Sequence, residues 1–251
     1  MTRTLLVRGM LVRGMLVGAV AGVLAFAVAY LIGEPPLEVG IAYEEATAPA
    51  HDHGDGTGGH SKADQAPPVS RTVQATAGLA TATIVLGVAL GGVYGLAYAA
   101  AQGRLGSSVR GTALAVAGFG FLALHLVPSL KYPANPPATS LDETIGSRTQ
   151  WYFALVALSL LVVISAVLLG RSLAPRLGAW NAVTVAALAG VAAVTVLLLA
   201  LPAFGETPAD YSAAALWQFR LASTAIQVTL WATLGLLFGA LTERSLRRAA
   251  G

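Results

Sequence analysis

The sequence predicts an all-α integral membrane protein, a bundle of six transmembrane helices. Three observations predict it: composition, six long apolar stretches, and an uneven distribution of arginine between the loops. Of the 251 residues, 56% are hydrophobic and only 11% are charged, and the mean hydropathy is +0.71. A soluble domain of this length could not cover so much apolar surface with so few charges. Lipid is therefore the solvent that the composition predicts.

The apolar stretches give the number of helices. A hydrocarbon core about 30 Å thick needs roughly 20 apolar residues per helix, at about 1.5 Å each. Six stretches meet this need: 15–33, 79–101, 111–127, 152–170, 181–201 and 221–241. The third is the shortest and the sixth the most polar, so a count of five stays open. The first stretch, which follows three arginines, also fits a cleavable secretory signal, and this is the alternative to a first membrane helix.

The charges predict the orientation of the helices. If the first helix runs outward, ten arginines lie in the inner segments, and five lysines or arginines lie in the outer loops. The reverse orientation violates the positive-inside rule at nearly every short loop. Eleven of the twelve acidic residues also fall outside, and only Glu243 falls inside. The pattern predicts both termini in the cytoplasm and all four histidines on the opposite side.

The largest outer loop, 34–78, is rich in His, Asp and Gly and carries the strongest chemical signal. Three histidines and two aspartates lie within ten residues: His51, Asp52, His53, Asp55 and His60. Imidazole and carboxylate are ligands for divalent ions such as Co, Ni, Zn and Mn. Ordering a glycine-rich loop costs conformational entropy, which keeps such a site weak and suits delivery better than storage. The alternative is a solvated polar linker whose histidines bind nothing.

His125 is the second candidate ligand, near the outer end of the third apolar stretch. An ionisable group within a span usually faces the bundle interior or a polar path, so we weigh metal contact equally with a bond to a neighbouring carbonyl. The prolines of 128–137 predict an irregular segment after it, buried in protein or beside a water-filled cavity. Together with Glu34, Glu44 and Glu45, His125 would pass a captured cation toward the bundle.

Two sequence patterns concern packing. Small residues at close spacing in 86–92 and 111–120 predict close helix–helix contact in lipid. Each outer loop also ends with an arginine near a glutamine: Arg71 with Gln74, Arg148 with Gln150, and Arg220 with Gln218. Three repeated helical hairpins would explain this pattern. The alternative is that membrane proteins reuse Arg, Gly and Pro at helix ends.

Several classes of function are disfavoured. The chain has no cysteine and therefore no thiolate site. It has no nucleotide-binding G-x-x-x-x-G-K-[ST] motif, no H-E-x-x-H and no G-x-S-x-G, so we expect no enzyme activity. Its basic residues are dispersed at helix ends with no stripe or aromatic platform, so we expect no nucleic-acid partner.

Several segments resemble the CbtA-type family of predicted cobalt transporter subunits. They are Gly33-Glu34-Pro35, 42–45, 69–74 and, most specifically, 128–137 followed by 144–149. The resemblance covers nearly the whole chain. It implies movement of Co²⁺ across the bacterial inner membrane for cobalamin synthesis, with a small single-span partner that has a histidine-rich end. Family descriptions give five spans, whereas the charges here favour six.

We therefore expect a permease, or a permease subunit, for a divalent metal. Co²⁺ is the favoured ion and Ni²⁺ the next, each transported rather than permanently bound. Uptake is the favoured direction because the candidate ligands lie outside. One alternative is a membrane scaffold or metal-sensing subunit that transports nothing, and another is a secondary transporter of a different solute. Homo-oligomer formation stays open.

Overall fold

The computed structural model describes residues 3–47, 69–106, 108–137, 139, 144–205 and 207–250. All regular elements within these residues are helices. In order they are α1 (Arg3–Val28), η1 (Ala29–Gly33), α2 (Glu34–Thr47), α3 (Arg71–Val73), η2 (Gln74–Gly78), α4 (Leu79–Ala101), α5 (Val109–Phe121), η3 (Leu122–Leu126), α6 (Val127–Lys131), α7 (Ile145–Ala200) and α8 (Ala213–Ala250), where η marks a π-helix. Five continuous helical stretches in the described part are long and apolar enough to cross a membrane.

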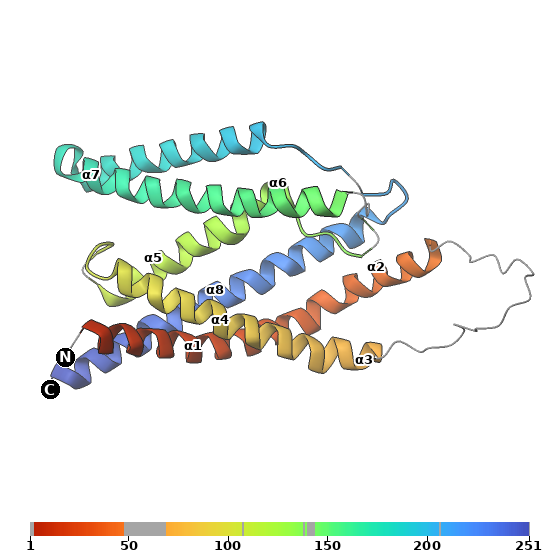
Figure 1. Ribbon diagram of the computed structural model, residues 1–251, viewed down its shortest axis with the longest axis horizontal. Helices are drawn as coiled ribbons and strands as arrows, with labels where there is room; N and C mark the ends of the chain where they lie inside the picture. The colour runs from red at the N-terminus through yellow and green to blue at the C-terminus, as the bar shows by residue number, and fades with distance from the viewer. Residues whose placement is uncertain are drawn as a thin grey trace, which may run out of the picture.

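The helices run between two ends of an elongated molecule (Figure 1). One end, which we call the terminus end, holds both chain termini, the connection from α4 to α5 and a turn within α7. The other, the loop end, holds the C-terminal end of α2, the start of α3 and the connections on either side of α7. The all-helical class predicted from the sequence is confirmed for the described residues, and the five apolar stretches support the predicted membrane character.

Helix α7 is a hairpin of two antiparallel limbs. It spans 56 residues, but Gly178 has non-helical angles, φ 75° and ψ 159°. This left-handed φ is accessible to glycine at little cost, and Pro175 just before it lacks the N–H that would continue the helix. Figure 1 shows α7 reaching the terminus end and turning back. Two of the six predicted stretches, 152–170 and 181–201, therefore lie on opposite sides of Gly178.

Glycines bring α1 and α4 into backbone contact. A Cβ atom added to Gly18 would lie 2.0 Å from the carbonyl oxygen of Gly87, and one added to Gly14 would lie 2.1 Å from that of Gly91. No side chain larger than hydrogen fits at either position without moving a backbone. In lipid such close approach supplies the van der Waals contact that holds helices together. The predicted close packing at Gly87 and Gly91 is confirmed.

Helix α8 completes a core bundle with α1, α4 and α5, which is where most of the fully buried side chains lie. Phe238 on α8 packs edge-on against Tyr94 and Tyr98 of α4, with ring centroids 5.2 and 4.9 Å apart. The Tyr94 hydroxyl donates a hydrogen bond of 2.7 Å to the carbonyl of Ala113 on α5. These contacts tie three helices together through one aromatic cluster.

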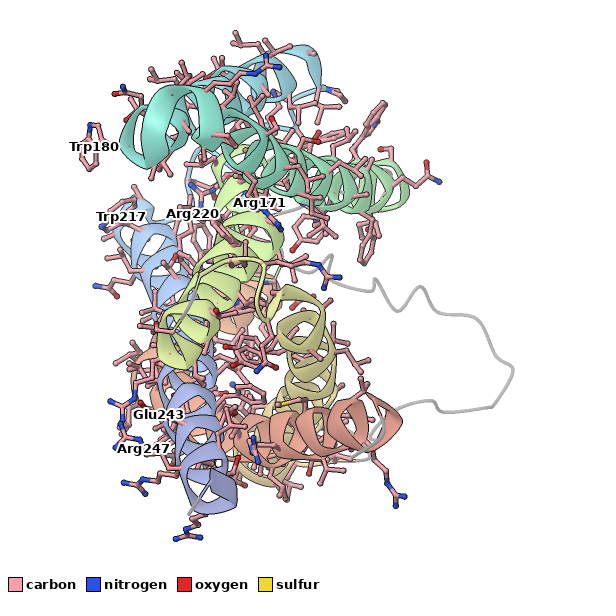
Figure 2. All side chains as sticks on the ribbon, turned by 90° about the vertical axis from the view of Figure 1, so that its left-hand side faces the viewer. Arg171, Trp180, Trp217, Arg220, Glu243 and Arg247 are labelled. Carbon is pink, nitrogen blue, oxygen red and sulfur yellow. The ribbon has the colours of Figure 1, made fainter. Side chains whose placement is uncertain are left out.

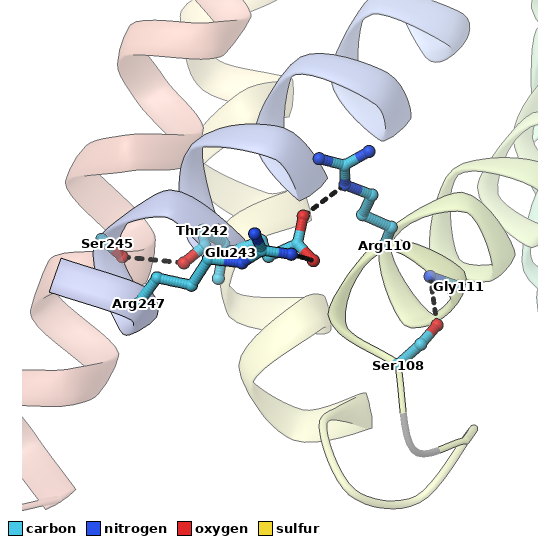
Figure 3. A network of polar contacts seen from close by, with 7 residues as sticks. All are labelled: Ser108, Arg110, Gly111, Thr242, Glu243, Ser245 and Arg247. Carbon is cyan, nitrogen blue, oxygen red and sulfur yellow. Dashed lines mark hydrogen bonds and ion pairs between the residues drawn. The ribbon is translucent and has the colours of Figure 1, made fainter. Parts of the chain in front are cut away.

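An ion-pair network joins α5 to α8 at the terminus end (Figure 3). The carboxylate of Glu243 on α8 pairs with Arg110 on α5 and, at 3.0 Å, with Arg247 on its own helix. The Ser108 side chain accepts a 2.9 Å hydrogen bond from the backbone N–H of Gly111 and so caps the start of α5. The network fixes the beginning of α5 against the last turns of α8.

The α7 hairpin lies beside this bundle and is attached mainly to η3 and α6. The Ser159 hydroxyl donates to the carbonyl of Ala123, and Lys131 Nζ donates to that of Leu198 at 2.7 Å. Most of the remaining hairpin surface is apolar and exposed, with Trp180 83% exposed at the turn. Figure 2 shows the Trp180 ring projecting away from the helices. Exposed tryptophan near a helix end is typical of a membrane interface.

Candidate functional site: a polar cavity at the loop end

Three π-helical segments lie toward the loop end, one in each of the first three membrane-crossing stretches. Segment η3 carries His125 and ends two residues before Pro128. The proline ring has no N–H and clashes with the carbonyl four residues earlier, so the chain widens by one residue in this turn. Single π turns are frequent at functional sites, because they redirect side chains that a regular helix would align. In this way the sequence around Pro128 positions His125.

The prediction that prolines exclude a helix from residue 128 onward is wrong for 128–131. These residues form α6, which includes Pro128 near its start. The wide π turn before it removes the requirement for a bond to the carbonyl four residues back, so the proline is tolerated. From Tyr132 to Pro137 the backbone is irregular, as predicted.

A cavity of about 360 Å³ lies between η3, α6, the irregular segment, the start of α7 and α8. It differs from the rest of the membrane region in its polar lining. The polar side chains that line it are His125, Ser129, Tyr132, Asn135, Arg148, Thr149, Tyr152, Ser223 and Gln227. Concave sites with convergent polar groups are where ligands bind.

His125 is the side chain of this lining that belongs to a type that commonly ligates metal ions. Its Nε2 atom is buried and has no hydrogen-bond partner in the described part of the chain. Its ring lies 5.5 Å from that of Phe121, one turn earlier. Buried polar atoms are nearly always bonded, so an unpartnered imidazole nitrogen beside a cavity points to a ligand or water. Within the described residues this nitrogen is not bonded to a neighbouring carbonyl, and metal contact at His125 stays a prediction.

The irregular segment is held in place by hydrogen bonds from neighbouring helices. Arg220 on α8 donates to Asn135 Oδ1 at 2.9 Å and to the carbonyl of Ala134 at 3.4 Å. The Tyr132 hydroxyl donates to the carbonyl of Pro202 at 2.8 Å. Burial raises the pKa of Tyr132, so this hydroxyl stays protonated and remains a donor at neutral pH. The wall of the cavity is therefore fixed from both α8 and the segment after α7.

The carboxylates predicted to act with His125 lie elsewhere. Glu34 is 8% exposed at the start of α2, where it forms an ion pair with Arg71. Glu44 and Glu45 are exposed on α2, which continues the first helix into residues that the sequence prediction assigned to the loop. No group of three or more His, Asp or Glu side chains in the described residues is arranged to hold a metal ion. His51, Asp52, His53, Asp55 and His60 lie outside the described residues, so the complete ligand set stays a prediction.

Sequence reasoning placed the 128–137 segment beside a cavity but missed the lining residues that α7 and α8 supply. Ser223 and Gln227 lie one turn apart on α8, and Arg148 and Tyr152 lie one turn apart on α7. The available signal was weak: the sixth apolar stretch was the most polar of the six, and Arg148 lay in the 144–149 motif. Nothing in the sequence placed these two helices against the same cavity.

Comparison with known proteins identifies one family. The family described as "Probable cobalt transporter subunit (CbtA)" matches residues 7–243. This match contains α2 to α7 in full, most of α1 and α8, and every residue that lines the polar cavity. Neither a curated protein nor a solved structure matches the chain.

Proposed function

Because the chain belongs to the CbtA family of probable cobalt transporter subunits, we propose that it is a membrane permease subunit for a divalent metal ion. Co²⁺ is the first candidate and Ni²⁺ the second, with uptake for cobalamin synthesis as the physiological role. The observation that carries the proposal is the buried, unpartnered Nε2 of His125 beside the polar cavity. Neutral imidazole binds both ions, and an ionisable residue inside a span is a functional candidate by default.

In the proposed route, the histidines and aspartates of 51–60 collect the ion outside the membrane. Glu44 and Glu45, both exposed on α2, hold it loosely near the bundle. His125 then takes it up at the cavity. One imidazole among hydroxyl and amide groups binds weakly, which suits a site that must release its ion. The ion pair of Glu34 with Arg71 would open if Glu34 took part.

We further propose that the chain crosses the membrane six times, with both termini in the cytoplasm. A straight helix of 56 residues would be about 84 Å long, against a hydrocarbon core of about 30 Å, so α7 supplies two crossings. Ten arginines belong to segments at the terminus end, which makes this the cytoplasmic end under the positive-inside rule. The three-hairpin repeat stays a prediction.

A small single-span partner with a histidine-rich end is part of the proposal, and the family's description as a transporter subunit supports the existence of a partner. Such an end would add imidazole ligands to the few that the described residues offer. The partner would therefore raise uptake at low metal concentration more than at saturation.

Uptake of radiolabelled cobalt by cells that contain this chain, with or without the partner, tests the proposal. We expect His125→Ala to lower uptake at least tenfold at equal membrane abundance. Thr184→Ala is the control, because Thr184 is exposed on α7 and its hydroxyl bonds to the carbonyl of Trp180 on the same helix. A transporter of another solute would be unaffected by replacing His51, His53, His60 and His125 together. A scaffold or sensor would give no uptake at all.

A further inference from the structure

A long apolar groove lies between α5 and the two limbs of α7. We call it the α5–α7 groove, and its volume is about 720 Å³. Arg104, Arg171 and Thr195 are the polar side chains among its lining residues, and the rest are mostly Ala, Val, Leu and Gly. Because the hairpin is attached through η3 and α6, its limbs are not packed tightly along α5. Such a surface in a membrane must be covered by something apolar.

Two uncompensated charges lie at the terminus end of this groove. Arg171 on the first limb of α7 forms no hydrogen bond or ion pair within the described residues. Arg104 follows α4 and donates one bond to the carbonyl of Ala100, which leaves its other N–H groups available. Figure 2, which views the molecule from the terminus end, shows Arg171 where α7 faces α5.

Within the described residues, no carboxylate pairs with either of these two arginines. Glu243 is the one acidic residue that the sequence places at this end, and it is bound by Arg110 and Arg247. Two guanidinium groups therefore lie at the mouth of an apolar groove without an anion. Arginine forms paired hydrogen bonds with phosphate oxygens, and basic pockets between helices on the cytoplasmic side of membranes bind anionic lipid head groups.

We propose that the α5–α7 groove binds an anionic phospholipid, with its phosphate at Arg104 and Arg171 and an acyl chain along the apolar walls. The two guanidinium groups at the mouth favour a phospholipid, which carries a phosphate and an apolar chain together, over an apolar partner helix. An acyl chain is thin and flexible enough to follow the space. This site is separate from the polar cavity and does not depend on the proposed function.

Native mass spectrometry of the purified full chain with phosphatidylglycerol or phosphatidylcholine tests the charge requirement. We expect phosphatidylglycerol to be retained preferentially. Each of Arg104→Gln and Arg171→Gln should weaken its binding roughly fivefold and leave phosphatidylcholine unchanged. Arg176→Gln is the matched control, because it removes the same charge near the turn of α7 at a residue outside the groove lining. Equal phosphatidylglycerol binding by the double variant and the control would overturn the proposal.

A second pair of variants tests the groove itself. Ala187→Trp places a large ring among the lining residues, whereas Leu188→Trp places it on the neighbouring lipid-facing position, which is 65% exposed. Only Ala187→Trp should displace the lipid. Both variants should remain monodisperse and unfold at the same temperature. If Ala187→Trp instead dissociates a dimer and leaves bound lipid unchanged, a second copy of the chain occupies the groove, and the lipid proposal is wrong.

Discussion

The core bundle of α1, α4, α5 and α8 and the α7 hairpin are held by different kinds of contact. The bundle is joined by glycine-mediated backbone contact, as between Gly18 and Gly87, and by the aromatic cluster at Phe238. The hairpin is held by a few hydrogen bonds, among them those of Ser159 and Lys131. Lipid offers no hydrophobic force between helices, so small residues decide which helices pack tightly. The polar cavity lies where these two regions meet. We attribute the open space to the looser packing between the hairpin and the bundle.

The largest effect should come from a single methyl group between α1 and α4. A Cβ at residue 91 would lie 2.2 Å from the carbonyl oxygen of Gly14, so Gly91→Ala forces the two backbones apart. We expect a loss of about 3 kcal/mol in unfolding free energy, or no folded protein. Gly118→Ala is the control, because nothing lies within 4 Å of its added Cβ, and it should change stability by no more than about 1 kcal/mol. An SDS unfolding titration measures both variants. Equal losses of unfolding free energy in Gly91→Ala and Gly118→Ala would contradict the expected difference.

A smaller effect is expected from emptying the aromatic cluster. Phe238 is 0% exposed, so Phe238→Ala leaves a cavity between α8 and α4. We expect a loss of about 2 kcal/mol, which is less than in a soluble core because lipid removes the transfer contribution. Leu188→Ala on the hairpin, where Leu188 is 65% exposed, should cost less than about 0.5 kcal/mol. Thermal unfolding followed by size-exclusion chromatography would rank the two variants.

Removing one attachment of the hairpin should have a modest effect on stability. Ser159 is 0% exposed, and Ser159→Ala leaves the carbonyl of Ala123 without this donor. We expect the free energy of unfolding to fall by about 1 kcal/mol. Hydrogen exchange should accelerate more in α7 than in α4. In Ser172→Ala the lost bond is local to α7, to the carbonyl of Leu169, so exchange should not change. If hydrogen exchange accelerated equally in α7 and α4 in both variants, Ser159 would not be an attachment of the hairpin.

The smallest effect is expected at the terminus end. Glu243→Gln removes the ion pairs with Arg110 and Arg247, whose side chains are 62% and 77% exposed. Exposed ion pairs contribute little to stability. We therefore expect Glu243→Gln to lower the free energy of unfolding by about 0.5 kcal/mol, and by less in high salt. Unfolding titrations at low and high salt measure it. A loss above about 2 kcal/mol would mean that this network, rather than the buried contacts of Ala113 and Ala117, holds α5 to the bundle.

Hydropathy and glycine spacing predicted the helices and part of their packing correctly. The apolar stretches fall on the observed helices, and Gly87 and Gly91 make the contacts expected of them. Their partners Gly14 and Gly18 were not identified, although the four-residue spacing was readable as a G-x-x-x-G pattern. The helix across Pro128 was not expected, because a π turn depends on local geometry that residue propensities do not encode.

The candidate site was predicted only in part, and the reason is its long-range character. His125 was identified because an ionisable residue in an apolar stretch is conspicuous. Gln227 and Tyr152 were not, because each is unremarkable within its own helix. Only the packing of α8 and α7 around the irregular segment brings them to one cavity. The interaction of Arg71 with Glu34 likewise joins residues 37 apart in sequence and gave no periodic signal.

Metal flux into liposomes tests the central claim most directly. The purified chain, alone and together with a small single-span histidine-rich partner, would be reconstituted around a metal-sensitive dye, and Co²⁺ would be added outside. Our account predicts dye quenching in at least one of the two preparations, slowed at least tenfold by His125→Ala and unchanged by Thr184→Ala. Folded protein that gives no flux in either preparation, or equal flux with and without His125, would contradict it.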